Sequence, residues 1–331
     1  MRLRRVALRI GAGLLVLLAL GVAFVAVQSQ RHPSLAPYRT LTLPEATQGD
    51  GVRVRFGGVS TLVFDDGETM WMTDGFFSRP SARQTFTGKI GPDAARIDTA
   101  LKQLGVTRLA AVIPVHSHYD HAMDSPLVAQ RTGALLIGSE SSLQIGRGLG
   151  LAPEQMKRVK PGELVTLGKF SLRFIASRHS PTPYSDGTSV ENIEAPVVPP
   201  ARATAYREGT VWSIAVTHAS GASFLVQGSA GFVPGALAGL HADTVFLGTG
   251  TLGKKDAAYR AAYWNETVKA VGAKRVIATH WDNFWLPLDQ PLQAMPLLLD
   301  DFDAVMADLA QRGAQDGVDI KLPPLFVPFK P

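Results

Sequence analysis

Four side chains that can bind a metal or move a proton lie close together in one short stretch. The sequence VHSHYDHAMD contains His116, His118, Asp120 and His121. His116 and His118 are two residues apart, so both imidazoles point the same way in an extended segment, and the other two follow where the chain turns towards a helix near Met123. Imidazole and carboxylate are natural ligands of zinc and similar divalent metals. A polar loop with a structural histidine is the alternative, and the density of ligands favours a metal site.

The composition limits the other chemistry that the chain can perform. It has 331 residues, of which 46% are hydrophobic, enough to bury the core of one large domain or two smaller ones. The chain contains no cysteine, which excludes disulfides, thiolate zinc sites and cysteine nucleophiles. Any metal site must therefore be built from histidines, of which there are 8, and from carboxylates.

Hydrophobic patterning predicts the elements that position these side chains. Helical spacing occurs at residues 91–105, 256–272 and 291–313. Runs typical of strands, bounded by turn residues, occur at residues 52–58, 60–66, 69–75, 108–115, 134–139, 163–168, 170–177, 210–218, 222–228, 242–250 and 275–280. This order predicts an α/β domain in which two sheets pack face to face with helices outside.

The histidine-rich stretch follows the run at residues 108–115, which is apolar throughout, as in a sheet buried on both faces. Such folds usually place their ligands beyond the carboxyl ends of strands. A polar, proline-rich loop from about Ser180 to Ala203 is expected to shape the substrate side, because specificity usually resides in loops.

HSHYDH resembles the H-x-H-x-D-H signature of the metallo-β-lactamase superfamily, a four-layer αββα fold of mostly hydrolytic metalloenzymes. The resemblance covers most of residues 52–290 and extends to three further stretches. TDGFFS contains Asp74 at the place of an early aspartate, SRHSPT contains His179, and VIATHWDNF contains His280.

The resemblance implies two metal sites, with one or two zinc ions as cofactor. His116, His118 and His179 would hold the first metal, and Asp120, His121 and His280 the second, with Asp120 also assigned a catalytic role. Three protein ligands per site leave room for a water nucleophile, as in catalytic zinc sites. Asp74 would orient a ligand histidine. An ordinary turn aspartate before Gly75 is the equal alternative for Asp74.

One position departs from the family pattern. Where an aspartate usually bridges the two metals, the stretch FLVQGSAGF has Ser229. The lost negative charge should weaken the second site. Asp282 can compensate, although a role in capping a helix is the more ordinary interpretation. His218, at the end of a strand expected near the site, is a candidate for substrate contact or a structural residue.

The N-terminus has the pattern of a signal anchor. MRLRRVALR is basic, and Ile10–Val27 is an uninterrupted apolar run that is just long enough to span a bilayer. No convincing cleavage site comes after it. We expect a transmembrane segment at residues 1–31, a linker at 32–50 and a hydrolase domain at 51–331. The domain should be extracytoplasmic, which means periplasmic in a Gram-negative bacterium.

The net charge of +5 comes from this N-terminal segment. Residues 1–31 contain five arginines and no acid, so the remainder of the chain is formally neutral. A neutral domain is a poor surface for nucleic acid, and this disfavours a nuclease.

The sequence therefore favours a membrane-anchored, metal-dependent hydrolase that uses a zinc-activated water. Its substrate would be a small molecule or a lipid with an ester, lactone, phosphodiester or amide bond. The alternative is a non-catalytic metal-binding or scaffold protein on the same fold, which would bind metal without turnover.

Overall fold

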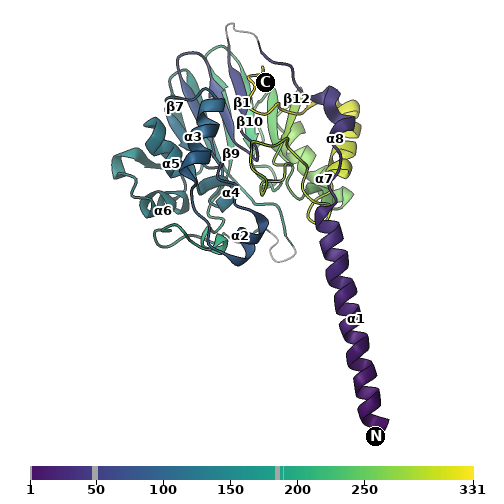
Figure 1. Ribbon diagram of the computed structural model, residues 1–331. Coiled ribbons are helices and arrows are strands. Elements are labelled where there is room, and N and C mark those ends of the chain that lie inside the picture. The colour runs from purple at the N-terminus through teal and green to yellow at the C-terminus, as the bar shows by residue number, and fades with distance from the viewer. Residues whose placement is uncertain (1, 47–50, 183–186, 189) are drawn as a thin grey trace.

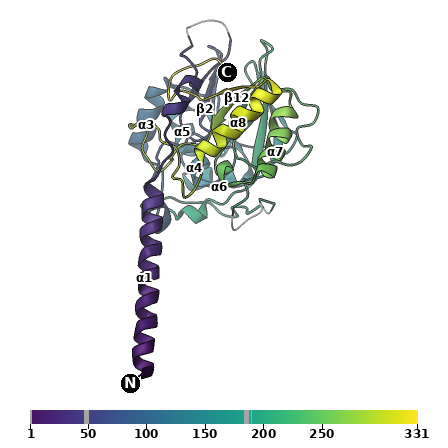
Figure 2. The ribbon, with the colours of Figure 1, turned by 90° about the vertical axis from the view of Figure 1, so that its right-hand side faces the viewer.

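The computed structural model describes residues 2–46, 51–182, 187–188 and 190–331. Parts of the expected linker (47–50) and of the expected loop (183–186 and 189) lie outside the described residues. Figure 1 shows a layered domain from which one long helix projects at the N-terminus. Figure 2 shows the same helix leaving the domain at the same end after a quarter turn.

The domain contains two sheets. The first has six strands in chain order: β1 (Arg53–Phe56), β2 (Leu62–Asp65), β3 (Met70–Thr73), β4 (Ala111–Ile113), β5 (Leu135–Gly138) and β6 (Met156–Arg158). The second has seven strands, whose spatial order runs from β13 back to β7: β7 (Leu164–Leu167), β8 (Phe170–Ser177), β9 (Val211–His218), β10 (Ser223–Gln227), β11 (Thr244–Gly248), β12 (Arg275–Thr279) and β13 (Asp319–Lys321).

The sheets face each other across a core rich in aromatic rings, and helices cover both outer faces. Phe64 and Trp71 stack in this core with centroids 4.3 Å apart. The helices are α1 (Arg2–Gln30), α2 (Ala82–Thr87), α3 (Ala94–Gln103), α4 (Tyr119–Ala122), α5 (Ser125–Thr132), α6 (Glu140–Gly148), α7 (Ala257–Trp264) and α8 (Phe302–Asp316). Buried residues of α3 and α5 pack on the first sheet, and those of α7 and α8 pack on the second. The expected αββα fold is confirmed.

Two expected segments differ in the structure. The helix expected at 291–313 is α8, which begins only at Phe302. Pro291 and Pro296 disfavour helix before that point, and the Asp301 side chain accepts a hydrogen bond from Ala304 N to start it. The described part of the expected linker packs on the domain: Ala36–Leu41 forms a 3-10 helix, and the buried Leu43 donates its N–H to Leu322 O.

The topology brings several strand ends to one edge of the sandwich. β3 and β4 are parallel, as are β10, β11 and β12. β8 and β10 are both antiparallel to β9, so their carboxyl ends also point the same way. The segments that come after these strands contain all the expected metal ligands.

Candidate metal centre

The histidine-rich segment follows β4 and leads into the short helix α4. His116 and Ser117 lie in the connection, His118 is the N-cap residue of α4, and Asp120 and His121 lie within α4. The buried Ser117 holds this connection in place, because its N–H and its hydroxyl both donate to Glu208 O, at 2.9 and 2.8 Å. His118 has extended backbone and the helical turn begins directly after it, so His116 and His118 precede that turn, whereas Asp120 and His121 lie on it.

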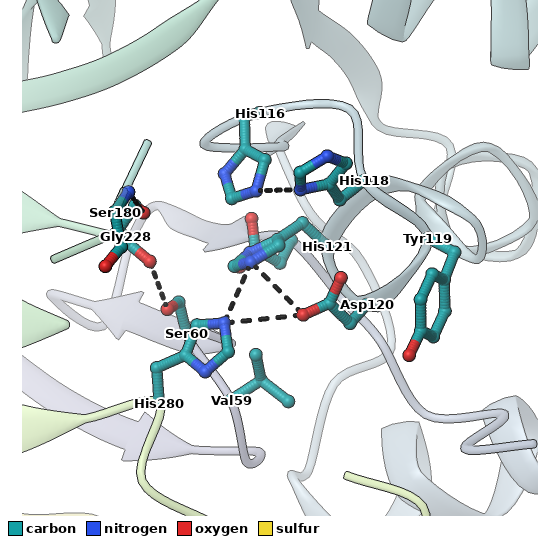
Figure 3. A network of polar contacts seen from close by, with 12 residues as sticks. Val59, Ser60, His116, His118, Tyr119, Asp120, His121, Ser180, Gly228 and His280 are labelled. Atoms are coloured by element: carbon teal, nitrogen blue, oxygen red, sulfur yellow. Dashed lines mark hydrogen bonds and ion pairs between the residues drawn. The ribbon is translucent and has the colours of Figure 1, made fainter. Parts of the chain in front are cut away.

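The six expected ligands gather in two groups of three. Figure 3 shows how His116, His118, Asp120, His121 and His280 lie around the site. In each group the ligand atoms lie within 4.8 Å of one another. The first group contains His116, His118 and His179, and the second contains Asp120, His121 and His280. His179 arrives from beyond β8 and His280 from beyond β12, so the fold joins positions 164 residues apart in sequence, from 116 to 280.

Hydrogen bonds orient two of the rings with one nitrogen left for a metal. His179 Nδ1 lies 2.8 Å from Ser180 O, and a carbonyl can only accept, so Nδ1 carries the proton and Nε2 keeps its lone pair. His121 Nδ1 lies 2.7 Å from the Asp74 carboxylate, so His121 Nε2 is likewise left for the site. Asp74 also accepts from Val115 N at 2.8 Å and is fully buried. The structure thus places Asp74 behind a ligand histidine.

The donor set fits a divalent metal. His116 Nε2 lies 3.1 Å from His118 Nδ1, and the same distance separates Nε2 of His121 from Nε2 of His280. Two nitrogens on one tetrahedral zinc are about 3.3 Å apart. Within the described chain, the buried Nδ1 atoms of His116 and His280 have no hydrogen-bond partner. Asp120 Oδ2 lies 3.4 Å from His280 Nε2, which places a carboxylate beside the second pair of nitrogens.

Burial sets the charge of the first group. Desolvation, with the neighbouring imidazoles, lowers the pKa of His118 to about 4, although Asp120 opposes it, and lowers the pKa of His179 to about 3. Burial also holds the pKa of His116 well below the ordinary value. All three rings are therefore neutral at pH 7, which is the form that binds metal.

The second group is electrostatically different. Burial lowers the pKa of His121, but Asp74 and Asp120 outweigh burial, so the net shift is upward. Burial raises the pKa of Asp120, but the histidines beside it outweigh burial and hold that pKa well below its ordinary value. Asp120 is therefore a carboxylate at neutral pH. It supplies a negative charge that the first group lacks.

The remaining candidates lie at three different places. Ser229 is buried beside the first group, where its Oγ accepts from Ser180 N at 3.0 Å. Asp282 is not in either ligand group, because its Oδ1 accepts from Val59 N and its Oδ2 pairs with Arg79. It does not cap a helix either.

The expected position of His218 near the site is wrong. His218 pairs with Phe170 at the start of β8, whereas His179 lies beyond the other end of that strand at Ser177. Seven residue steps at about 3.3 Å separate these ends by roughly 23 Å. The ring instead contacts Asp66 at 3.1 Å and Ser220 at 2.8 Å. Because β9 runs antiparallel to β8, its carboxyl end lies at the opposite edge.

Two acids near the first group were not identified from the sequence. The charge of Glu191 acts on His118, and burial together with Glu191 raises the pKa of Glu208 to about 7. Both come from the segment around 190–208, which contains no recognisable motif. Spatial proximity alone reveals them.

Comparison with known proteins supports the fold. No protein-family model and no curated protein matches the sequence. Among solved structures, the chain is similar to Igni18, a metallo hydrolase from Ignicoccus hospitalis, at 14% identity and a TM-score of 0.52, covering 82% of this chain and 94% of that one. It is also similar to a possible metal-dependent hydrolase from Veillonella parvula, at 12% identity and a TM-score of 0.51, covering 85% and 99%.

A third similar structure is the metallo-β-lactamase fold protein YhfI from Bacillus subtilis, at 15% identity, covering 83% of this chain and 96% of that one. Its TM-score is 0.46. At identities of this level, the likenesses establish the fold alone. The chain has the αββα fold that the sequence resemblance implied, with two adjacent groups of side chains that could bind metal.

Proposed function

We propose that this protein is a metal-dependent hydrolase anchored in a membrane by α1. The observation that carries the proposal is the convergence of six buried or half-buried ligand side chains in two adjacent groups of three. Ordinary structural histidines are scattered and individually paired, whereas these five imidazoles face one another. Igni18 is a metallo hydrolase and the Veillonella protein is a possible metal-dependent hydrolase, and both descriptions agree with this function.

Six side chains would bind the metal ions, and two aspartates, Asp74 and Asp120, control the protonation of the groups around them. Bound divalent metal, with zinc as the expected ion, would supply a Lewis acid and a water nucleophile at neutral pH. His116, His118 and His179 would hold one ion, and Asp120, His121 and His280 a second, weaker one. Asp74 fixes the tautomer of His121. The Asp120 carboxylate, which lies 3.4 Å from His280 Nε2, would accept a proton from the attacking water.

Aromatic rings lie against one side of the second ligand group. Phe284 packs edge-on against His280, with ring centroids 5.8 Å apart, and against Tyr119 at 6.2 Å. Tyr119 is joined to Trp285, whose Nε1 donates to its hydroxyl at 3.2 Å. These rings favour an ester, lactone, phosphodiester or amide whose reacting group carries an apolar substituent.

The anchor proposal depends on the composition and exposure of α1. The most apolar 18-residue window within Arg9–Gln30 has a mean hydropathy of 2.7, and none of its residues is buried, so the segment is not a core helix of the domain. It is the one helix in the described chain that is long and apolar enough to span a membrane, by length and composition alone. We propose that the arginine-rich end stays in the cytoplasm and that the domain lies outside it.

Turnover assays on the full chain test this function. Detergent-purified protein, reconstituted with zinc, should hydrolyse at least one member of a panel of esters, lactones, phosphodiesters and amides. The Asp120→Asn variant should lose that activity while remaining folded. Bound metal without turnover on any class would instead favour a metal-binding scaffold.

A further inference from the structure

The membrane helix and the metal centre are joined at one end of the domain. Arg31, just after α1, accepts a hydrogen bond through its carbonyl from Leu297 N at 2.8 Å. Two residues earlier, Met295 N donates to Trp281 O at 3.1 Å, and Trp281 directly follows His280. The segment 295–297 therefore bonds both to the end of α1 and to the loop that contains the candidate ligand His280. Figure 1 shows that α2 lies at the same end, on the side from which α1 projects.

Exposed apolar side chains occur at this end. Phe86 on α2 is 69% exposed, and Val198 is 67% exposed. Val198 lies beside Pro199, which packs against Gly91 just beyond α2. Leu298 and Leu299, next to the residue that bonds Arg31, are 41% and 37% exposed. A soluble surface rarely gathers large exposed side chains in this way unless they meet a partner.

Phe86 is part of an aromatic series that leads inward. Its ring meets Trp285 edge-on at 5.3 Å, and Trp285 meets Phe284 at 5.2 Å. Phe284 in turn packs on His280. The other four tryptophans of the chain are buried, so Trp285 is the partly exposed one. Aromatic rings with one wet and one apolar side are enriched at the level of lipid headgroups.

Two cations flank Phe86. Arg83 lies on α2 and Lys89 comes after it, and both are exposed. Neither forms an ion pair with any residue that the structure describes. The capping box of Ser81 and Gln84 defines α2 locally, so this short helix presents Phe86 and Arg83 in a fixed arrangement. Exposed cations beside exposed aromatic rings suit lipid phosphate and the apolar region beneath it.

We propose that the surface formed by Arg83, Phe86, Lys89, Val198 and Trp285, here called the α2 surface, lies on the bilayer that α1 spans. The partner is the lipid itself, with Phe86 below the headgroups and the two cations at the phosphates. The inference rests on the proposed membrane anchor, because α1 brings this end of the domain to the membrane. The mouth of the metal centre then faces the lipid surface.

The cysteine-free sequence permits a direct test in the full chain. Phe86→Cys introduces one thiol for a bimane fluorophore, and Lys89→Cys provides a second reporter on the same surface. Leu164→Cys is the matched control, because Leu164 is 53% exposed on the edge strand β7 and pairs with Arg173, four residues before the end of β8 that leads to His179. Each labelled protein is reconstituted into phosphatidylcholine vesicles with and without phosphatidylglycerol, and with a lipid carrying a nitroxide near the headgroup.

The proposal predicts about twofold or greater quenching of both α2 reporters by the nitroxide lipid, with little quenching at position 164. Added phosphatidylglycerol should strengthen the quenching, and Arg83→Gln should weaken it. In unlabelled protein, Trp285 fluorescence should be quenched by the same lipid, and Trp285→Phe should remove that component. Flotation of the vesicles after a carbonate wash distinguishes failure of the α2 surface from failure of the membrane anchor. Protein that floats while positions 86 and 89 stay unquenched overturns the α2 surface alone; protein that does not float overturns the anchor and the surface with it.

Discussion

Arg79 and Asp282 form a fully buried ion pair, with Nη2 2.6 Å from Oδ2 and neither side chain exposed. The other oxygen of Asp282 accepts from Val59 N at 2.8 Å, and Val59 O accepts from His280 N at 2.7 Å. Three of these residues, Val59, Arg79 and His280, have left-handed backbone, at φ 53°, 41° and 58°. For a β-branched residue such as Val59 this conformation is costly and must be enforced by its surroundings. The Arg79–Asp282 pair therefore stabilises the backbone conformation that positions the candidate ligand His280.

Replacing one partner of this pair should be far more damaging than replacing both. Arg79→Met leaves the Asp282 charge buried without a partner, so we expect a loss of about 3–5 kcal/mol in the free energy of unfolding. The double variant Arg79→Met/Asp282→Leu should lose much less than the sum of the single losses. Chemical denaturation of the four proteins in detergent measures the coupling. Strictly additive losses would show that the pair does not act as a unit.

The same pair should also affect the second metal. If it positions His280, the folded double variant should hold its first metal while its second-site occupancy falls. Gly58 provides a further control, since its φ is 88° and a Cβ there would clash with Arg79 Nη2. Gly58→Ala should therefore reproduce the loss of second-site metal without removing either charge.

Glu208 should make stability depend on pH. Burial and Glu191 raise its pKa from 4.5 to about 7 in the folded chain. The folded state then binds this proton more tightly than the unfolded state, so the free energy of unfolding should fall as pH rises from about 4.5 to about 7. In chelator-treated protein, Glu208→Gln should gain stability relative to wild type across that window. Glu191→Gln should move the effect to lower pH, and a difference independent of pH would refute the assignment.

The Ser229 position makes a prediction about metal stoichiometry. A neutral hydroxyl neither offsets the charge of two cations nor spans them, so wild type should hold its first metal firmly and its second weakly. Ser229→Asp should raise occupancy of the second site, because a carboxylate restores the missing charge next to Ser180. Elemental analysis of both proteins decides the matter. Two tightly bound metals in each would mean that another group already supplies the bridge.

Hydrophobic patterning predicted most of the fold, and the resemblance to the metallo-β-lactamase superfamily implied the two groups of ligands. Apolar runs such as Ala111–Ile113 are buried on both faces, and residues just beyond them must lie at the sheet edge. Arg79 was not predicted, because its role depends on a partner 203 residues away in sequence. His218 was misplaced because strand direction cannot be read from a single run of residues. The helix α8 begins later than hydrophobic spacing predicts, because Pro291 and Pro296 disfavour helix before Phe302.

The orientation of the anchor is open to a simple test in cells. The basic flank should stay in the cytoplasm, and the domain on the far side of the apolar run should be exported. A reporter that is active only outside the cytoplasm, fused after Arg31, should be active, and a reporter that works only inside should be silent. Shifting arginines from the first nine residues to the far side of Val27 should reverse both readings. Activity of the cytoplasmic reporter alone would contradict the proposed topology.

The metal content of full-length protein, compared with that of His118→Ala, tests the central claim most directly. Wild type purified without chelator should contain at least one divalent metal per chain by elemental analysis. In His118→Ala, bound metal and hydrolysis should fall together while the circular dichroism spectrum is unchanged, because a methyl group cannot replace an imidazole ligand. Chelator treatment of wild type should abolish hydrolysis, and zinc should restore it. Equal metal content in the two proteins, or turnover that survives both the substitution and the chelator, would contradict the assignment of this site as the metal centre of a hydrolase.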